Sequence, residues 1–196
     1  MSGQVRWWTQ LDLRRTGRQL LEWMVVLAVA GGAAILIRTF VFQRFFISGP
    51  SMEPTVFDAD QILVSKFAYR FGSPQPGDVV VFDRITSDGA IVQHDDLIKR
   101  VIATEGQTIE IRACVVSIDG RPLAEPYLDS DPSSDLVARC RIPDMEPIRV
   151  PVGDVFVMGD NRAESYDSRM FGPVDAHQVV GRAVVVIWPI REWHRL

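Results

Sequence analysis

Residues 97–120 read LIKRVIATEGQTIEIRACVVSIDG, and this stretch decides the class of fold that the sequence predicts. Apolar or alternating runs over 97–103, 108–112 and 115–118 have the length and the two-residue period of β-strands. Asp119-Gly120, at the end of the stretch, is a strong signal for a two-residue β-hairpin turn. The sequence therefore predicts short strands joined by tight turns.

Similar short runs continue on both sides of this stretch. The further strands that the pattern predicts lie over 61–67, 77–82, 155–158 and 182–188. Residues 128–150 are rich in Asp, Ser, Pro and Arg and show little periodicity, which predicts an exposed excursion instead of a core element. We therefore expect a mainly β domain over residues 43–196.

A long apolar segment precedes this domain. Residues 20–42 are overwhelmingly apolar, and the stretch from Trp23 to Ile37 carries no charge. A helix needs about 20 apolar residues to cross a bilayer core, so residues 20–42 are predicted to form one transmembrane anchor helix. Residues 1–19 contain most of the nearby arginines, and the positive-inside bias places them in the cytoplasm and the β domain outside.

A cleavable secretory signal is the alternative interpretation of the apolar segment. Ala28, Val29 and Ala30 form an A-x-A pattern of the kind found at signal cleavage sites. Apolar residues continue as far as Ile37, which is more typical of an uncleaved anchor than of a short signal core. The expected location is therefore the cell membrane, crossed once by the chain.

Composition argues against several classes of partner. The formal net charge is -4, so the chain lacks the basic footprint that attracts nucleic acid. Its two cysteines, Cys114 and Cys140, do not have the spacing of a zinc site, and no metal or cofactor is predicted. Outside the cytoplasm the pair could form a disulfide; the sequence leaves a disulfide and two unlinked thiols as equal alternatives.

One serine and two lysines are candidates for nucleophilic catalysis. Ser51 lies in a turn-prone stretch close to the apolar segment, but a serine hydroxyl needs a base to remove its proton. Arginine cannot act as this base, and the only lysines are Lys66 and Lys99. On a strand over 97–103, Lys99 shares a face with apolar residues, and burial favours the neutral amine. Lys66 also has apolar neighbours, so local pattern does not choose between the two lysines.

A Ser-His-Asp triad is the other catalytic arrangement to consider. His94 is followed by Asp95 and Asp96, but adjacent residues of an extended segment point to opposite faces. A triad is defined by geometry, and this short run does not establish it. A solvated polar turn is the preferred interpretation.

Four blocks of sequence follow the apolar segment in one order. They are Ser-Met-Glu-Pro-Thr at 51–55, Gly-Asp-Val-Val-Val-Phe at 77–82, Lys-Arg-Val-Ile at 99–102 and Gly-Asp-Asn-Arg-Ala-Glu-Ser-Tyr-Asp-Ser-Arg at 159–169. Together they resemble the bacterial type I signal peptidases, also called leader peptidases, from about residue 20 to residue 189. This resemblance implies a signal-peptidase-like β-fold catalytic domain preceded by one N-terminal transmembrane helix.

The resemblance also implies a serine endopeptidase with a Ser/Lys dyad. Ser51 would attack the carbonyl group at the signal-peptide junction, and neutral Lys99 would take its proton and return it to the leaving amine. Ser165 matches the serine that orients the lysine through a hydrogen bond. In the same way, Asp167 and Arg169 match a supporting ion pair, and Asp160 and Arg100 would hold neighbouring strands.

Small apolar pockets for the substrate are a further implication of the resemblance. They would accept alanine-like residues one and three positions before the cut. The residues that would line them are Ile47, Met52, Val56 and Ile98. A shallow apolar pocket excludes bulky side chains sterically, which suits an A-x-A preference. The expected partners are preprotein signal peptides and membrane lipid.

Two places depart from the family pattern. Gly49 stands where some family members carry a hydroxyl group that helps bind the oxyanion. The Ser51 N–H is one expected donor to the oxyanion, and the sequence does not identify the second donor. Ala103, Glu105 and Gln107 stand where the pattern has Gly, Pro and Asp. The second departure lies in the turn that follows the predicted strand of Lys99, so it bears on the geometry of that turn and not on the chemistry.

Two other functions remain as alternatives. The first is a narrower Ser/Lys peptidase that matures one pilus or conjugation protein. The second is a catalytically silent anchored β domain that binds partners. The joint presence of Ser51, Lys99 and Ser165 favours catalysis over silence.

Overall fold

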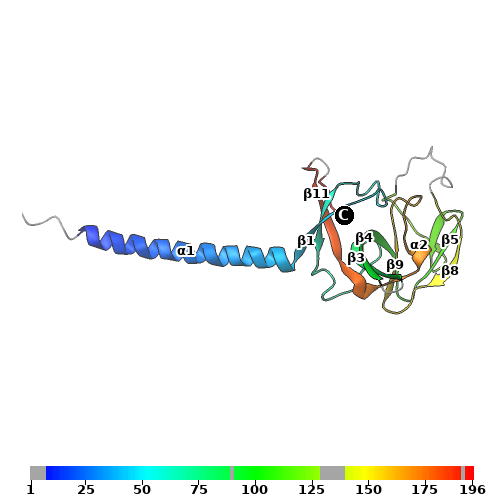
Figure 1. Ribbon diagram of the computed structural model, residues 1–196, viewed down its shortest axis with the longest axis horizontal. Helices are drawn as coiled ribbons and strands as arrows, with labels where there is room; N and C mark the ends of the chain where they lie inside the picture. The colour runs from blue at the N-terminus through cyan, green and yellow to red at the C-terminus, as the bar shows by residue number, and fades with distance from the viewer. Residues whose placement is uncertain (1–7, 89–90, 129–139, 191–192) are drawn as a thin grey trace, which may run out of the picture. The chain divides into compact units, whose positions relative to one another are not determined.

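The structure is a computed structural model, and it describes residues 8–88, 91–128, 140–190 and 193–196. The chain forms two units, Met1–Val41 and Phe42–Leu196 (Figure 1). The first unit is the helix α1 (Trp8–Phe40) and the second contains two β-sheets with short helical segments. The fold is therefore mainly β behind one N-terminal helix, as predicted.

Helix α1 begins well before the predicted anchor segment. Its first part belongs to the segment 1–19, of which residues 1–7 lie outside the described part of the chain. Arg18 Nε donates to Glu22 Oε1 at 2.9 Å, a contact one turn apart that supports the helix before the apolar stretch. The 19 residues Gly17–Ile35, which include Arg18 and Glu22, are apolar enough on average and long enough to cross a membrane, since they cover about 28 Å.

Both sheets of the second unit are antiparallel. The larger sheet has seven strands in the order β1-β2-β11-β3-β4-β9-β10, and the smaller has four in the order β7-β6-β5-β8. The bounds in the larger sheet are β1 (Phe42–Phe46), β2 (Gln61–Ser65), β3 (Val79–Asp88), β4 (Ile91–Thr104), β9 (Asp154–Met158), β10 (Val174–Asp175) and β11 (Val179–Trp188). Those in the smaller sheet are β5 (Thr108–Arg112), β6 (Val115–Ile118), β7 (Arg121–Pro122) and β8 (Met145–Arg149). The short helical segments are α2 (Ser168–Phe171) and η1 (Ala176–Gln178).

The predicted strands are confirmed, with some ends shifted. Strands β5 and β6 have the predicted bounds, whereas β3 and β4 are longer than predicted and form one extended hairpin. Asp119 and Gly120 connect β6 to β7 with φ values of 51° and 73°. Two successive positive φ values are typical of the hairpin turn that Asp-Gly predicts.

The C-terminal part of the predicted excursion over 128–150 contains an exposed strand that the sequence pattern did not predict. Met145–Arg149 forms strand β8, which pairs with β5 at the edge of the smaller sheet. Pro147 interrupts the sequence pattern, but proline is tolerated on an edge strand, where one side of the backbone has no partner. Residues 129–139, the middle of the predicted excursion, lie outside the described residues.

A buried apolar cluster joins the two sheets. Ile102 of β4 and Phe156 of β9 pack with Ile109 and Ile111 of β5, and all four side chains are almost completely buried. Figure 1 shows β5 and β8 beyond β9, at one end of the unit. This packing holds the smaller sheet against β4 and β9 of the larger sheet. The chain segment that follows β7 is held near the same strands.

A disulfide links Cys114 to Cys140, whose Cα atoms are 5.9 Å apart. Ala113 and Cys114 form the tight turn between β5 and β6, with φ values of 46° and 67° that side chains rarely adopt. The Ala113 N–H donates to Asp144 Oδ1 at 3.0 Å, and the Cys114 N–H donates to the Pro143 carbonyl at 2.8 Å. Residues 140–144 therefore hold this strained turn in place.

Candidate active site

Ser51 lies in the loop between β1 and β2. The Val56 N–H donates to the Met52 carbonyl at 3.0 Å, and both of these side chains are fully buried in the core. From the opposite segment, the Asn161 N–H donates to the Ser51 carbonyl at 3.1 Å. The loop is thus held from both sides, and this support fixes the position of the serine.

Lys99 of β4 points its amine at this serine. Its Nζ donates to Ser51 Oγ at 2.8 Å and to the Ile98 carbonyl at 2.7 Å. The residue is only 3% exposed, and this burial lowers the pKa of Lys99 to about 8 although the carboxylates of Asp167 and Asp160 oppose the shift. About one amine in ten is then neutral at pH 7, and the arrangement joins a serine hydroxyl to an amine that can accept its proton.

The other candidates for a base lie in different surroundings. Lys66 follows the end of β2 and is exposed. His94 is also exposed, and its Nδ1 lies 2.7 Å from Asp83 Oδ2. Asp95 and Asp96 are exposed as well, so the predicted solvation is confirmed, but the predicted turn is wrong because all three residues lie within strand β4. Lys99 therefore differs from these groups in both its burial and its contact with a serine hydroxyl.

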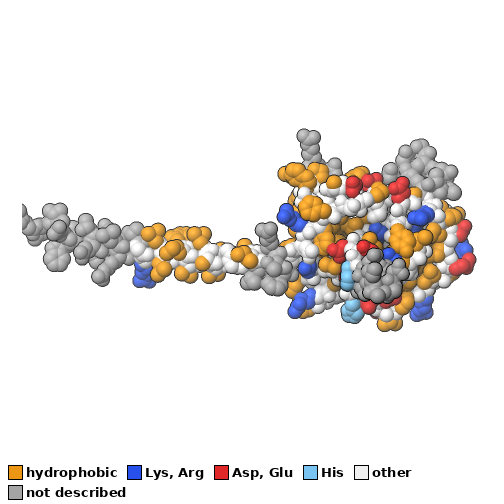
Figure 2. Space-filling model, viewed as in Figure 1, with side chains coloured by type: hydrophobic (Ala, Val, Ile, Leu, Met, Phe, Trp, Pro, Cys, Tyr) orange, Lys and Arg blue, Asp and Glu red, His pale blue; other side chains and the backbone are white. Residues whose placement is uncertain are grey.

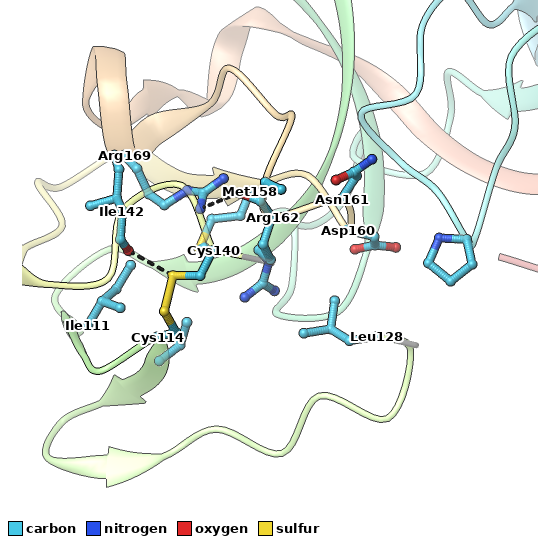
Figure 3. Close-up of a pocket in the computed structure, with 13 residues that line it drawn as sticks. Ile111, Cys114, Leu128, Cys140, Ile142, Met158, Asp160, Asn161, Arg162 and Arg169 are labelled. Carbon is cyan, nitrogen blue, oxygen red and sulfur yellow. Dashed lines mark hydrogen bonds between the residues drawn. A yellow bond between two sulfur atoms is a disulfide. The ribbon is translucent and has the colours of Figure 1, made fainter. Parts of the chain in front are cut away.

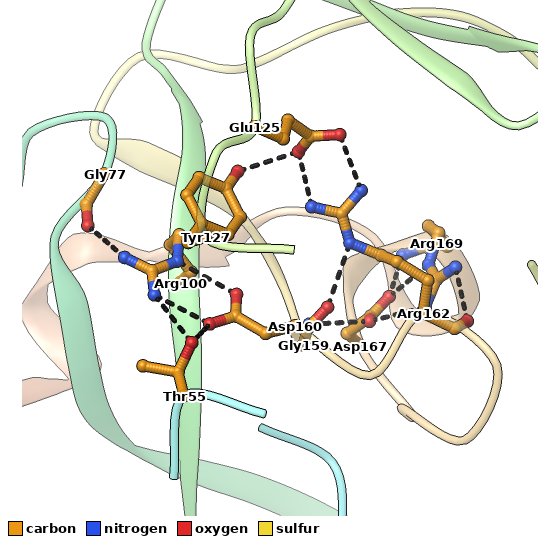
Figure 4. A network of polar contacts seen from close by, with 10 residues as sticks. All are labelled: Thr55, Gly77, Arg100, Glu125, Tyr127, Gly159, Asp160, Arg162, Asp167 and Arg169. Atoms are coloured by element: carbon orange, nitrogen blue, oxygen red, sulfur yellow. Dashed lines mark hydrogen bonds and ion pairs between the residues drawn. The ribbon is translucent and has the colours of Figure 1, made fainter. Parts of the chain in front are cut away.

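Arg100 and Asp160 form a buried bidentate ion pair (Figure 4). Arg100 Nε donates to Asp160 Oδ1 at 2.9 Å and Nη2 donates to Oδ2 at 2.7 Å. Arg100 also donates to the Gly77 carbonyl at 2.9 Å, and Thr55 Oγ1 donates to Asp160. Arg100 follows Lys99 on β4, and Thr55 lies in the loop that contains Ser51. The contacts of this pair therefore connect β4, the Ser51 loop and the segment that contains Asp160.

Asp167 and Arg169 form a second buried ion pair on α2. Arg169 Nε and Nη2 each donate to the Asp167 carboxylate at 2.8 Å, and the Gly159 N–H donates to it at 2.9 Å. Burial alone raises the pKa of Asp167, but Arg169 and the Gly159 N–H hold it below its ordinary value. The carboxylate is therefore ionised, and it is the charge that most strongly raises the pKa of Lys99.

Ser165 is completely buried beside this pair. Its Oγ makes no hydrogen bond of ordinary length and angle within the described residues, although its hydroxyl contributes to the low pKa of Asp167. The predicted hydrogen bond between Ser165 and Lys99 is therefore not present in this structure, where Lys99 Nζ binds Ser51 Oγ and the Ile98 carbonyl. A Cβ atom at Gly159 would clash with Ser165 Oγ and with the Ser51 carbonyl oxygen. Ser165, Gly159 and Ser51 are therefore packed so closely that only glycine fits between them.

The four predicted pocket residues lie together in one core cluster. Ile47 and Ile98 are 7% and 9% exposed, while Met52 and Val56 have no exposed surface. A cavity of about 310 Å³ lies elsewhere, against the Cys114–Cys140 disulfide and Arg162 (Figure 3). Neither Ser51 nor Lys99 lines that cavity, so it is distinct from the predicted substrate pockets.

The Gly49 departure from the family pattern has a local explanation. Gly49 has a φ of 91°, which favours glycine, and its N–H donates to Asp58 Oδ1 at 2.8 Å. The Gly49 N–H is therefore already engaged. The Ser51 N–H has no hydrogen-bond acceptor in the described part of the chain and is available for an oxyanion.

The turn after β4 is closed by hydrogen bonds, some of them from the side chains that replace the family pattern. Gln107 Oε1 accepts from the Thr104 N–H at 2.8 Å, and the Gly106 N–H donates to the Val150 carbonyl at 2.9 Å. Glu105 Oε2 accepts from the Gly153 N–H at 2.7 Å. The side chains that replace the family pattern thus close the turn by their own hydrogen bonds.

Glu125 and Tyr127 belong to the same polar network but were not found from the sequence (Figure 4). They lie after β7 and before the predicted excursion over 128–150, where the residue pattern indicated no particular element. The Tyr127 ring lies under the Arg100 guanidinium, and Glu125 binds Arg162. An adjacent acidic and aromatic pair is too common a pattern to predict such contacts.

Comparison with known proteins identifies relatives along most of the chain. The family model described as "Signal peptidase, peptidase S26" matches residues 20–188. Signal peptidase I of Mycobacterium tuberculosis is 36% identical over 221 residues, covering 89% of this chain and 74% of that protein. Probable signal peptidase I-1 of Synechocystis is 39% identical over 175 residues, covering 87% and 84%.

A solved structure is similar as well. A signal peptidase I from Enterococcus faecalis is 32% identical, with a TM-score of 0.46, covering 56% of this chain and 95% of that one. The family model covers far more than half of the chain, and the curated relatives match over most of their own length. The chain therefore belongs to the signal peptidases of peptidase family S26, and it is a serine endopeptidase that cleaves signal peptides.

Proposed function

We propose that Ser51 is the nucleophile and Lys99 the general base of this peptidase. The observation that carries the proposal is the 2.8 Å contact between Lys99 Nζ and Ser51 Oγ, made by an amine that is 3% exposed. A general base must lie within hydrogen-bond reach of the proton it takes and have a pKa near the working pH. Lys99 meets the first condition through its contact with Ser51 Oγ. It meets the second because burial lowers its pKa to about 8.

The proposed reaction has two halves. Neutral Lys99 takes the proton of Ser51 as Oγ forms a bond to the scissile carbonyl carbon, and the Ser51 N–H binds the developing oxyanion. The ammonium of Lys99 then protonates the leaving amine as the peptide C–N bond breaks, which leaves an acyl-enzyme. Lys99 next takes a proton from water as the water oxygen forms a bond to the ester carbonyl carbon. The bond from that carbon to Ser51 Oγ then breaks, Oγ takes the proton back from the Lys99 ammonium, and the new carboxyl end of the cleaved peptide leaves.

The remaining predicted residues support this chemistry in the proposal. Ser165, buried beside Gly159, is proposed to bind Lys99 and orient it during the reaction. The Arg100–Asp160 and Asp167–Arg169 pairs hold the segments around the dyad. Ionised Asp167 and Asp160 also stabilise the lysine ammonium that forms after proton transfer.

Substrate selection is proposed to depend on the apolar surface beside Ser51. Ile47 and Ile98 each keep some exposed surface and belong to the same apolar cluster as Met52 and Val56, which are fully buried. Such a surface would admit alanine at the positions one and three residues before the cut and exclude larger side chains. An A-x-A junction is therefore the proposed recognition signal.

The proposed location is the cell membrane, with residues 1–19 in the cytoplasm and the β domain outside. Support comes from the Gly17–Ile35 stretch, which has the length and composition of a membrane span. The Cys114–Cys140 disulfide fits an oxidising compartment. Figure 2 shows apolar side chains at the surface of the β unit, and exposed examples such as Phe71 and Trp193 are suited to contact with lipid.

Cleavage of a defined preprotein tests the proposed specificity. The detergent-solubilised full chain should cut a preprotein with an A-x-A junction at that junction, as located by mass spectrometry of the products. Leucine at the position before the cut should lower kcat/KM by about 100-fold or more, because the shallow pocket cannot accommodate it.

A matched preprotein with leucine two positions before the cut serves as the control, since that side chain would not enter either pocket. Equal cleavage of the leucine and alanine junctions would contradict the pocket assignment. Failure to cut any A-x-A preprotein, with activity on one dedicated substrate, would establish the narrower peptidase instead.

A further inference from the structure

We propose that Glu125 and Tyr127, which follow β7 of the smaller sheet, are positioning residues for the segment that supports Ser51. This inference rests on the proposed Ser51 and Lys99 chemistry. It assigns to the segment that follows β7 a part in catalysis, exerted through the residues 159–162 (Figure 4).

The first contact is between Tyr127 and the strand that carries Lys99. The Arg100 guanidinium carbon lies 4.0 Å from the centre of the Tyr127 ring, which is the geometry of a cation–π interaction. The Tyr127 hydroxyl donates to Glu125 Oε1 at 2.7 Å. Burial and the nearby Glu125 raise the pKa of Tyr127, so the hydroxyl keeps its proton and remains a donor.

The second contact is between Glu125 and Arg162. Arg162 Nη1 donates to Glu125 Oε2 at 3.0 Å, and Nη2 donates to Oε1, so the carboxylate binds the guanidinium at both ends. The side chains of Arg162 and Glu125 are 9% and 11% exposed. Charge-assisted bidentate pairs of this kind fix geometry as well as adding energy, because both groups are planar and the donors are parallel.

Arg162 transmits this contact to the reaction centre through its neighbours in the chain. Its Nε donates to the Gly159 carbonyl at 3.0 Å, and its own carbonyl accepts from Arg169 at 2.9 Å. Between these two anchored positions, the Asn161 N–H donates to the Ser51 carbonyl at 3.1 Å. Glu125 therefore fixes the short segment that in turn fixes the backbone of the proposed nucleophile.

Removal of the Glu125 charge would leave the Arg162 guanidinium buried without its carboxylate. A buried charge that loses its partner moves towards water or another acceptor, and the residues 159–162 would move with it. Displacements of about 1 Å at a reacting group can lower a rate by about 100-fold. The proposed substrate pockets are formed by other elements, so substrate binding should change little.

The decisive variant is Glu125→Gln in the detergent-solubilised full chain, compared with parent protein and with Glu146→Gln. Glu146 is a matched control because it also pairs with an arginine, Arg112 at 3.1 Å, but is 84% exposed. With an A-x-A peptide substrate, Glu125→Gln should lower kcat by about 10- to 100-fold and leave KM within about 2-fold. Glu146→Gln should match the parent in both constants.

Tyr127→Phe provides a second, gentler variant that keeps the ring on Arg100 but removes the donor to Glu125. It should lower kcat by about 2- to 10-fold at unchanged KM. The pH midpoint of activity should not move in either variant, because the charges that act on Lys99 are Asp167, Asp160 and Arg169. Circular dichroism at the assay temperature establishes that each compared variant is folded.

The outcomes separate this inference from the proposed function. If the parent cleaves, Ser51→Ala does not, and folded Glu125→Gln retains the parental kcat, the positioning role is overturned while the dyad stands. Should Glu125→Gln not fold, a parental kcat in Tyr127→Phe overturns the role, and a lowered kcat at unchanged KM supports it. Cleavage by Ser51→Ala at the parental rate overturns the proposed function itself.

Discussion

Replacement of Ser51 by alanine is expected to lower kcat for cleavage of an A-x-A preprotein by roughly 10⁴-fold or more. The reason is that no other hydroxyl lies in hydrogen-bond contact with Lys99 Nζ among the described residues. The folded state should be little affected, because the hydroxyl contributes one hydrogen bond, which is worth about 1 kcal/mol. Single-turnover cleavage, followed by gel and mass spectrometry, measures the loss.

Ser73→Ala is the matched control for this change. Ser73 is exposed in the loop before β3, so its replacement should leave both cleavage and stability at the parental values. Parental activity in a folded Ser51→Ala variant would show that another group is the nucleophile.

Replacement of Lys99 by methionine is expected to abolish activity and to stabilise the protein at neutral pH. Loss of the base should lower kcat by about 10²- to 10⁴-fold, and the double variant with Ser51→Ala should be no less active than Ser51→Ala alone. Methionine has a similar length and no charge, so the amine's burial no longer costs free energy. Chemical unfolding monitored by circular dichroism gives the stability.

The sign of the stability change follows from the pKa of Lys99. Burial lowers this pKa from its ordinary value of 10.5 to about 8, so between these values the unfolded chain binds more protons than the folded chain. Stability of the parent should therefore rise as pH rises from about 8 towards 10.5. Below pH 8 the full cost of about 3 kcal/mol is present, and the methionine variant avoids it.

The stabilisation of Lys99→Met should accordingly be largest at pH 7 and decrease above pH 8. Lys66→Met, at the exposed lysine, should change stability by less than about 0.5 kcal/mol at any pH. A stability difference between parent and Lys99→Met that does not vary with pH would contradict the assigned pKa.

The strands of the β domain could be predicted because their burial alternates along the sequence. In β2 and β5, Ile62, Val64, Ile109 and Ile111 are all buried and alternate with less buried neighbours. Strand β8 escaped prediction because Pro147 lies within it and its exposed edge leaves few apolar residues to signal a strand. An edge strand forms because it pairs with a neighbouring strand, and this pairing is a tertiary contact. The local residue pattern does not show such contacts.

The choice between the two lysines shows the same limit within the site. Lys66 and Lys99 have similar apolar neighbours in sequence, and the four sequence blocks were needed to favour Lys99. In the structure the two differ because β4 is covered on both sides by other strands, whereas Lys66 follows the end of β2. Burial, which gives the amine its low pKa, comes from pairing between segments far apart in the chain.

Glu125 and Tyr127 illustrate a contact that sequence reasoning had no means to find. Glu125 binds Arg162, which is 37 residues further along the chain. Tyr127 contacts Arg100, which lies on strand β4 of the larger sheet. The apolar cluster between the two sheets brings these segments together. The contacts between charged groups in a site therefore depend on the packing of apolar side chains elsewhere in the domain.

The pH dependence of kcat/KM tests the central claim, that neutral Lys99 is the base for Ser51, most directly. With an A-x-A peptide that has no titrating group between pH 5 and 10, kcat/KM should rise with a midpoint near pH 8 and level off above it. Asp167→Asn should move the midpoint to lower pH, because Asp167 raises the pKa of Lys99. A midpoint near the ordinary histidine pKa of about 6.5, unchanged in Asp167→Asn, would contradict the assignment of Lys99 as the base.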